Sequence, residues 1–117
     1  MCGIYLSNIH FSSKEIEEKL DKIKFRGPDN FGVVQKEKLS LGHLRLSILD
    51  LDERSNQPFI YEQLSLVYNG EIYNFKEVRE LLIVQGYTFE TTSDSEVLLK
   101  GYHAWGEQVL DRINGMF

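Results

Sequence analysis

The sequence predicts an α+β domain, because short strand-like segments are mixed with a few helical ones and neighbouring strands follow one another as in hairpins. Residues 2–8 alternate apolar with other residues, as a strand does. Residues 31–35 and 39–51 read as two strands joined around the polar stretch 36–38, and a further strand is expected at 64–69. Hairpin-like neighbours favour a layered α+β domain over a doubly wound parallel sheet.

The first helix is expected after Ser12 or Ser13, either of which can cap it, with acidic residues in its first turn. Ile16, Leu20 and Ile23 recur at spacings of four and three. This spacing places them on one stripe of a helix, which we expect to face the core.

Two further helices are expected in the second half of the chain. One covers 75–85 and stops at Gly86. The last helix starts at Ser93 or Asp94, both capping residues, and is interrupted at Gly106. Its expected core-facing positions, at spacings of four and three, are Leu98, Tyr102, Trp105, Val109 and Ile113.

The composition excludes several classes of protein. The 117 residues suffice for one domain with a real core, and the net charge of −5, with no block of Lys or Arg, argues against nucleic acid or an anionic membrane as partner. A single cysteine builds no disulfide framework, which favours a reducing, cytoplasmic location. We expect no signal peptide and no membrane-spanning segment.

The one cysteine, Cys2, directly follows Met1. Once the methionine is removed, the residue carries a thiol and an α-amine whose pKa of about 7.7–8.0 suits a base. The alternatives are a buried structural cysteine and a Cys/His pair with His10, His43 or His103 as the base. Nothing in the spacing selects one histidine, and for His43 a hydrogen-bonded structural role is favoured.

The stretch YNGEIYN is the second candidate for chemistry. Asn69 offers a side-chain amide donor and Gly70 a backbone N–H without a side chain in the way, and two such donors form an oxyanion hole. Glu71 adds a negative charge nearby. The alternative is a tight Asn-Gly turn, since both residues tolerate a positive φ.

Arg45 and Asp94 are candidates for binding the charged end of an amino acid. The guanidinium of Arg45, which stands among apolar neighbours, suits an α-carboxylate, and the Asp94 carboxylate suits an α-ammonium. A surface ion pair for the arginine and a helix cap for the aspartate are the alternatives. We expect no metal site, because one cysteine and three scattered histidines offer no ligand spacing, and no phosphate-binding glycine loop is present.

The order of the motifs carries more information than any one of them. MCGI, RGPD, GHLRLSILDL, QPF, VYNGEIYN, SDSEVLL and NGMF follow one another along the chain. In this order the sequence resembles the N-terminal glutaminase domain of glutamine-hydrolysing asparagine synthetases, which are class II glutamine amidotransferases. The similarity runs from residue 2 to the last residue. Amidotransferases of surface-polysaccharide clusters share these motifs and remain an alternative.

The resemblance implies an N-terminal-nucleophile hydrolase fold, a layered α/β/β/α sandwich, with Cys2 as the nucleophile and L-glutamine as the substrate. Asn69 and Gly70 match the oxyanion hole, Arg45 matches the clamp on the glutamine α-carboxylate, and Glu71 and Asp94 match the residues near its α-amino group. The backbone of four consecutive residues lines the same pocket: Leu46, Ser47, Ile48 and Leu49. Arg26, in RGPD, lies in a loop near the site.

The departure from the family is length. Family members continue past NGMF with further strands, so residues 1–117 are expected to be a partial glutaminase domain, incomplete at its C-terminus. The resemblance implies that ATP and Mg²⁺ act on an absent synthetase domain or subunit, that no cofactor binds this chain, and that full-length members can form oligomers. The alternatives are a catalytically inactive remnant or interaction domain, and an unrelated cytosolic α+β domain with a structural Cys2.

Overall fold

The computed structural model describes residues 2–48 and 50–117, so Met1 and the predicted pocket residue Leu49 lie outside the described residues. Its main sheet is antiparallel and has the strand order β1 (Gly3–Ser7), β3 (Leu39–Arg45), β2 (Asn30–Lys36). The predicted hairpin between the second and third strands is confirmed. Gly3 pairs with Leu44, and this register brings the residue before β1 next to the end of β3.

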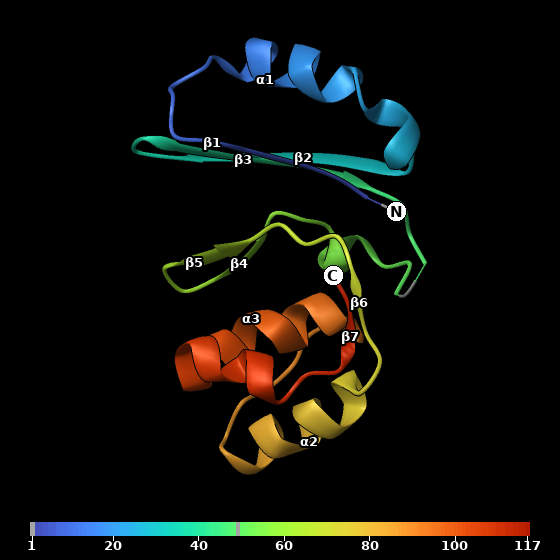
Figure 1. Ribbon diagram of the computed structural model, residues 1–117, viewed down its shortest axis with the longest axis vertical. Coiled ribbons are helices and arrows are strands. Elements are labelled where there is room, and N and C mark those ends of the chain that lie inside the picture. Colours follow the sequence, from blue (N-terminus) through green and yellow to red (C-terminus); the bar gives the residue numbers. More distant parts are fainter. Residues whose placement is uncertain (1, 49) are drawn as a thin grey trace.

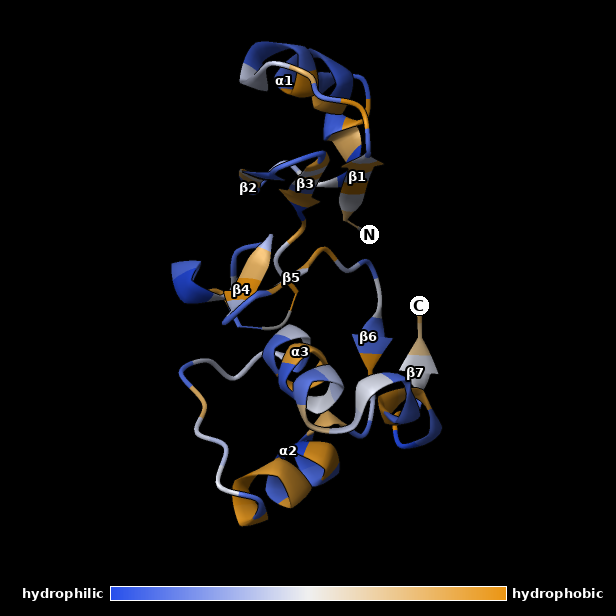
Figure 2. Cartoon of the chain, turned by 90° about the vertical axis from the view of Figure 1, so that its left-hand side faces the viewer, coloured by the Kyte–Doolittle hydropathy of each residue, from blue (hydrophilic) through white to orange (hydrophobic). Residues whose placement is uncertain are grey.

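Helix α1 (Ser13–Asp21) covers one face of this sheet (Figure 1). Ser12 caps it: its side chain accepts from the Glu15 N–H, and the Glu15 carboxylate accepts from the Ser12 N–H, a reciprocal capping box. Ile16 and Leu20 are buried with Leu44 of β3, as their spacing predicted. Figure 2 shows apolar colour on the side of α1 that faces the strands. Ile23 lies beyond the helix end but still packs against this cluster.

On the other side of the sheet lies the hairpin of β4 (Phe59–Tyr61) and β5 (Leu64–Leu66), and α3 (Asp94–Trp105) follows beyond it (Figure 1). The strands predicted at 39–51 and 64–69 were too long, because they end at Arg45 and Leu66. After β3 the chain leaves the sheet and wraps around the Arg45 side chain, through the short 3-10 helix η2 (Glu53–Ser55). The alternation of apolar residues continues past Arg45, but the described strand pairing ends at that residue.

Helix α2 (Phe75–Val84) packs on α3 through Val78, Leu82 and Val97. The predicted helix at 75–85 and the interruption of the last helix at Gly106 are confirmed; beyond it the chain continues as the 3-10 helix η3 (Gly106–Asp111).

The predicted core-facing stripe of α3 was wrong in part. Val97, not Leu98, is fully buried, and Tyr102 is 46% exposed. Helix α3 touches α2 and η3 as well as the β4–β5 hairpin. It therefore buries more than one face, including the polar Glu96 and Lys100, and a single apolar stripe does not identify its buried side.

The last short strands, β6 (Glu71–Ile72) and β7 (Gly115–Met116), form an antiparallel pair. Asn74 extends this pairing, since its side chain donates to the Arg112 carbonyl and accepts from the Asn114 N–H. The residues of NGMF thus lie against NGEIYN. In the described part of the chain no helix is long and apolar enough to cross a membrane.

Candidate active site around Cys2

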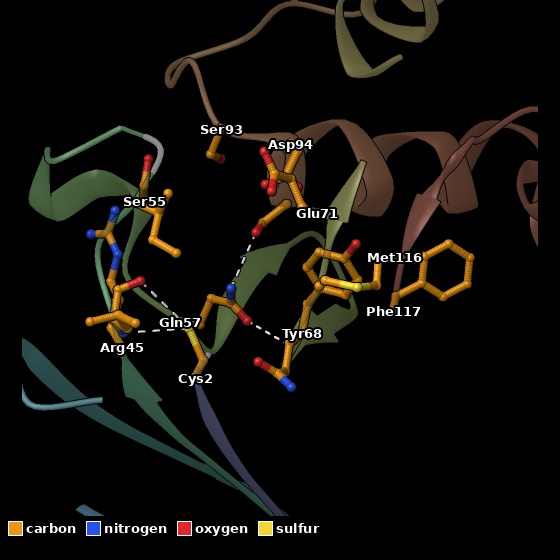
Figure 3. A pocket seen from close by; sticks show the side chains of 15 residues that line it. Cys2, Arg45, Ser55, Gln57, Tyr68, Glu71, Ser93, Asp94, Met116 and Phe117 are labelled. Atoms are coloured by element: carbon orange, nitrogen blue, oxygen red, sulfur yellow. Dashed lines mark hydrogen bonds between the residues drawn. The ribbon is translucent and has the colours of Figure 1, made fainter. Parts of the chain in front are cut away.

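A cavity of about 250 Å³ opens where the main sheet meets the start of α3 (Figure 3). It brings together the residue before β1, the end of β3, the segment before β6 and the first residues of α3. The candidate residues that line it are Cys2, Arg45, Leu46, Ile48, Asn69, Gly70, Glu71 and Asp94. Residues as far apart in the sequence as Cys2 and Asp94 therefore line the same cavity.

Cys2 is half-buried at the edge of this cavity. The backbone N–H of Leu46 donates to its Sγ at 3.4 Å, and the Sγ lies 3.7 Å from the Leu46 carbonyl oxygen. On the other side, the Nε of Arg26 donates to the Cys2 carbonyl at 3.1 Å. These contacts fix the cysteine backbone and orient its sulfur towards the turn after β3.

The RGPD segment holds that same turn. The backbone N–H of Asp29 donates to the Arg45 carbonyl at 3.0 Å, and its carboxylate accepts from the backbone N–H of Ser47 at 2.7 Å. Together with Arg26, this segment therefore supports both Cys2 and the residues that follow β3. Ser47, a predicted pocket residue, bonds to Asp29 and is not among the residues lining the cavity.

The guanidinium of Arg45 is buried at the end of β3. It donates to the Asp52 carbonyl at 3.0 Å, to the Asn56 side-chain oxygen at 2.7 Å and to the Asp50 carbonyl. The loop after β3 is thus organised around this cation, which also lines the cavity. The alternative of a surface ion pair is wrong, because Arg45 is only 6% exposed, and its partners among the described residues include two backbone carbonyls and an amide.

The Asn69–Gly70 pair lies in the segment between β5 and β6. The tight-turn alternative with positive φ is wrong at Gly70, because the described glycines with positive φ are Gly86 and Gly106. Gly70 is needed for close approach instead: a Cβ there would lie 2.5 Å from the Met116 carbonyl oxygen and 2.6 Å from the Tyr68 hydroxyl. The absent side chain leaves room for the chain to line the cavity.

Asp94 is the first residue of α3, and the cap is its neighbour Ser93, which accepts from the Glu96 N–H. The helix-cap alternative for Asp94 is therefore wrong. Its carboxylate accepts from the backbone N–H of Ile72 at 3.0 Å and lines the cavity. Burial raises the pKa of Asp94 above the ordinary 3.8, and the Glu71 carboxylate adds to the rise, although hydrogen bonds to backbone N–H groups oppose it.

The described residues that line the cavity include no histidine. His43 is completely buried and its Nε2 donates to the Tyr68 carbonyl at 3.2 Å, which confirms the hydrogen-bonded structural role. Burial lowers the pKa of His43 from 6.5 to about 4. His103 contacts the Tyr87 hydroxyl and the Glu62 carboxylate, away from the cavity. The geometry therefore gives no support to a Cys/His pair.

The sequence analysis assigned no role in the site to the other cavity residues. They are Ser55, Gln57, Tyr68, Ser93, Ser95, Met116 and Phe117. Gln57 and Ser95 stood within the motifs QPF and SDSEVLL, and Met116 and Phe117 within NGMF, but no residue type or spacing among them indicated a site. They come from η2 and the loop before β4, the segment between β5 and β6, the start of α3, and the end of the chain at β7.

Comparisons with known proteins agree with the motif order. A family model described as "Glutamine amidotransferase domain" matches residues 1–117. "Asparagine synthetase [glutamine-hydrolyzing] 1" of Bacillus subtilis is 43% identical over 87% of this chain and 16% of its own length. "Asparagine synthetase [glutamine-hydrolyzing] 3" of the same organism is 36% identical over 100% of this chain and 20% of its own length. "Amidase chyE" of Penicillium rubens is 37% identical over 88% of this chain and 16% of its own length.

The first two relatives thus share only 16% and 20% of their own length with this chain. The family model, in contrast, covers every residue of the chain, and the motifs that it spans include those that form the cavity. The chain belongs to the glutamine amidotransferase domain family.

Proposed function

We propose that this chain is the glutaminase part of a glutamine-hydrolysing asparagine synthetase. The observation that carries the proposal is the meeting of Cys2, the Asn69–Gly70 pair and Asp94 on one cavity. Hydrolysis of an amide by covalent catalysis uses a nucleophile and oxyanion donors, and a carboxylate can bind the ammonium group of an amino acid. The asparagine synthetases among the relatives direct the assignment to this branch of the family.

Catalysis begins when Met1 has been removed and the α-amine of Cys2 is free. The amine takes the thiol proton, and the sulfur attacks the side-chain carbonyl carbon of glutamine. Asn69 and Gly70 donate hydrogen bonds to the oxyanion of the tetrahedral intermediate. As the intermediate collapses, the protonated α-amine returns its proton to the leaving nitrogen, and ammonia departs. Water then hydrolyses the γ-glutamyl thioester to glutamate and restores the thiol.

The charged end of the substrate lies between two groups of opposite sign. Arg45 supplies positive charge for the α-carboxylate, and its bonds to the loop after β3 keep the guanidinium in place. Asp94 and Glu71 supply negative charge for the α-ammonium. Leu46 and Ile48 line the pocket beside them, and Ser47 helps to hold the same turn through the bond of its backbone N–H to Asp29.

The fold supports the assignment to the N-terminal-nucleophile hydrolases. From one end to the other, the layers are α1, the main sheet, the β4–β5 hairpin, and α3 with α2 (Figure 1). This order of layers corresponds to that of an α/β/β/α sandwich in which the β4–β5 hairpin belongs to the second sheet.

The ammonia released here would amidate aspartate at a synthetase domain or subunit, where ATP and Mg²⁺ act, in the cytoplasm. A second candidate is an amidase whose substrate is not free glutamine, and the observation that favours it is the similarity to the Penicillium amidase.

The test is ammonia release from L-glutamine by the chain, with Cys2→Ala as the control and the intact mass as a check that Met1 is absent. Cys2-dependent release of ammonia and glutamate in equal amounts is the expected result. Equal release by both proteins would refute the mechanism. A panel of other primary amides, hydrolysed in preference to glutamine by Cys2, would favour the second candidate.

A further inference from the structure

Gln57 is the first residue of the motif QPF, and its side chain lies in the middle of the cavity lining (Figure 3). Its side chain is buried, with the whole residue 8% exposed, in the segment between η2 and β4. A buried primary amide costs free energy unless its polar atoms are hydrogen-bonded. The partners of this amide therefore indicate why it is there.

Two hydrogen bonds define its orientation. The side-chain oxygen Oε1 accepts from the backbone N–H of Tyr68 at 2.6 Å, and Nε2 donates to the Oγ of Ser95 at 3.2 Å. Because a backbone N–H only donates, the oxygen must face Tyr68, and the nitrogen is left to face Ser95. The amide thus bridges two segments that are 27 residues apart in the sequence.

Both partners adjoin candidate site residues. Tyr68 directly precedes the Asn69–Gly70 pair, and Ser95 directly follows Asp94. One side chain thus connects the candidate oxyanion donors to the candidate ammonium-binding carboxylate. A second contact joins the same two regions, because the Asp94 carboxylate accepts from the backbone N–H of Ile72, two residues after Gly70.

Residues of the main sheet contact both Gln57 and Tyr68. A Cβ at Gly32 of β2 would lie 2.1 Å from the Gln57 carbonyl oxygen, so the Gln57 backbone rests directly on the strand. His43 of β3 donates to the Tyr68 carbonyl, so both peptide groups of Tyr68 are held by buried side chains. Because β1 of the same sheet begins next to Cys2, the nucleophile and the bridge share one rigid base.

We propose that Gln57 is a positioning residue that holds the Asn69–Gly70 pair and Asp94 at a fixed separation around the bound amino acid. This inference rests on the proposed glutaminase function. Through Tyr68 it acts on the oxyanion donors, which matter in the transition state and therefore in kcat. Through Ser95 it acts on Asp94, which binds the ammonium in the ground state and therefore affects KM. Displacements of about 1 Å at such groups cost about 100-fold in rate.

The test compares three variants of the full 117-residue chain with the parent protein. Gln57→Met keeps a similar volume but removes both hydrogen bonds, and Ser95→Ala removes only the bond on the Asp94 side. Gln85→Met makes the same chemical change at an exposed position at the end of α2, outside the cavity, and serves as the control. For each we measure kcat and KM for glutamine, the melting temperature, and amide hydrogen exchange of segments 68–70 and 93–96.

We expect Gln57→Met to lower kcat by roughly 10- to 100-fold and to raise KM. Ser95→Ala should raise KM by roughly 3- to 10-fold with a smaller change in kcat. The double variant should be no worse in KM than Gln57→Met alone, because both substitutions break the same bond. Hydrogen exchange should rise in both segments for Gln57→Met and only in 93–96 for Ser95→Ala.

Several outcomes would overturn the inference. The first is a folded Gln57→Met variant whose kcat and amide hydrogen exchange are unchanged. The second is a double variant in which the effects of the two substitutions on KM are strictly additive. The third is a Ser95→Ala variant that lowers kcat as much as Gln57→Met does. If Gln57→Met does not fold, unchanged KM in Ser95→Ala still overturns it. If the parent chain hydrolyses glutamine without depending on Cys2, the proposed function is refuted instead. The hydrogen exchange of segments 68–70 and 93–96 then still shows whether Gln57 holds the two segments in place.

Discussion

The carboxylate of Asp94 accepts a hydrogen bond from the backbone N–H of Ile72 at 3.0 Å, which joins the first turn of α3 to β6. Ile72 follows Glu71 and stands two residues after Gly70. One contact therefore fixes the candidate ammonium-binding group relative to the candidate oxyanion donors. Asp94 also lines the cavity, so this contact places the carboxylate at the cavity wall.

Asp94→Asn is expected to weaken glutamine binding while keeping the fold. The amide oxygen of Asn can still accept from the Ile72 N–H, but the charge that pairs with an ammonium is lost. KM for glutamine should rise by roughly 10- to 100-fold. The melting temperature should stay or rise, because the parent protein buries an ionised carboxylate at neutral pH. An unchanged KM would show that Asp94 does not bind the substrate.

The affinity for glutamine should also fall on the acid side. The pKa of Asp94 is raised by burial, so this carboxylate takes up a proton at a higher pH than an ordinary aspartate. The protonated form cannot pair with an ammonium, and KM should therefore rise as pH falls through the raised pKa. Kinetics of the parent and Asp94→Asn at several pH values measure this. The variant should lack this rise, and the same rise in both proteins would assign it to another group.

His43 should make the folded state lose stability between pH 6.5 and about 4. The unfolded chain protonates its histidine near pH 6.5, whereas the buried His43 stays neutral down to about pH 4. The unfolded state therefore binds more protons in this window, and stability falls as pH falls. The shift corresponds to about 3 kcal/mol when complete.

Urea unfolding of the parent and of His43→Gln across this window measures the effect. The glutamine amide can still donate to the Tyr68 carbonyl but does not titrate. The carboxylates titrate alike in both proteins, so the difference between the two curves isolates His43. Parallel curves would contradict the assignment.

The ion pair of Glu96 and Lys100 should stabilise the start of α3. Their side chains are 1% and 7% exposed, and the Lys100 Nζ lies 2.6 Å from the Glu96 carboxylate. That carboxylate also accepts from the backbone N–H groups of Glu90 and Thr91, so it holds the loop that leads to Asp94. Glu96→Gln leaves a buried ammonium without its counter-charge and should cost about 3–5 kcal/mol in urea unfolding.

The matched control is the exposed pair of Lys24 and Asp21, whose atoms are 3.7 Å apart. Asp21→Asn should change the free energy of unfolding by no more than about 0.5 kcal/mol. The double variant Glu96→Gln/Lys100→Met should lose less than the sum of the single variants, because both remove one interaction. Additive losses would show that the two charges act independently.

Local features of the fold could be predicted from the sequence because they depend on residues a few positions apart. The capping box at Ser12, the stripe of Ile16 and Leu20, and the end of α2 at Gly86 are such features. Predictions failed where an element has several neighbours or none. The buried side of α3 was misplaced because the helix contacts α2 on one side and the β4–β5 hairpin on another. The strand at 39–51 was too long because the described pairing of β3 with its neighbours ends at Arg45.

By itself, the sequence determined the family, because the order of motifs from MCGI to NGMF is a property of the chain that needs no contacts. It also determined which residue types are present for the chemistry. Only the tertiary structure decided that Cys2, Asn69 and Asp94 line one cavity, and that Gln57 joins two of its walls. The physical reason is that these contacts link positions that no periodicity relates, and they form only when the sheet, the hairpin and α3 are packed together.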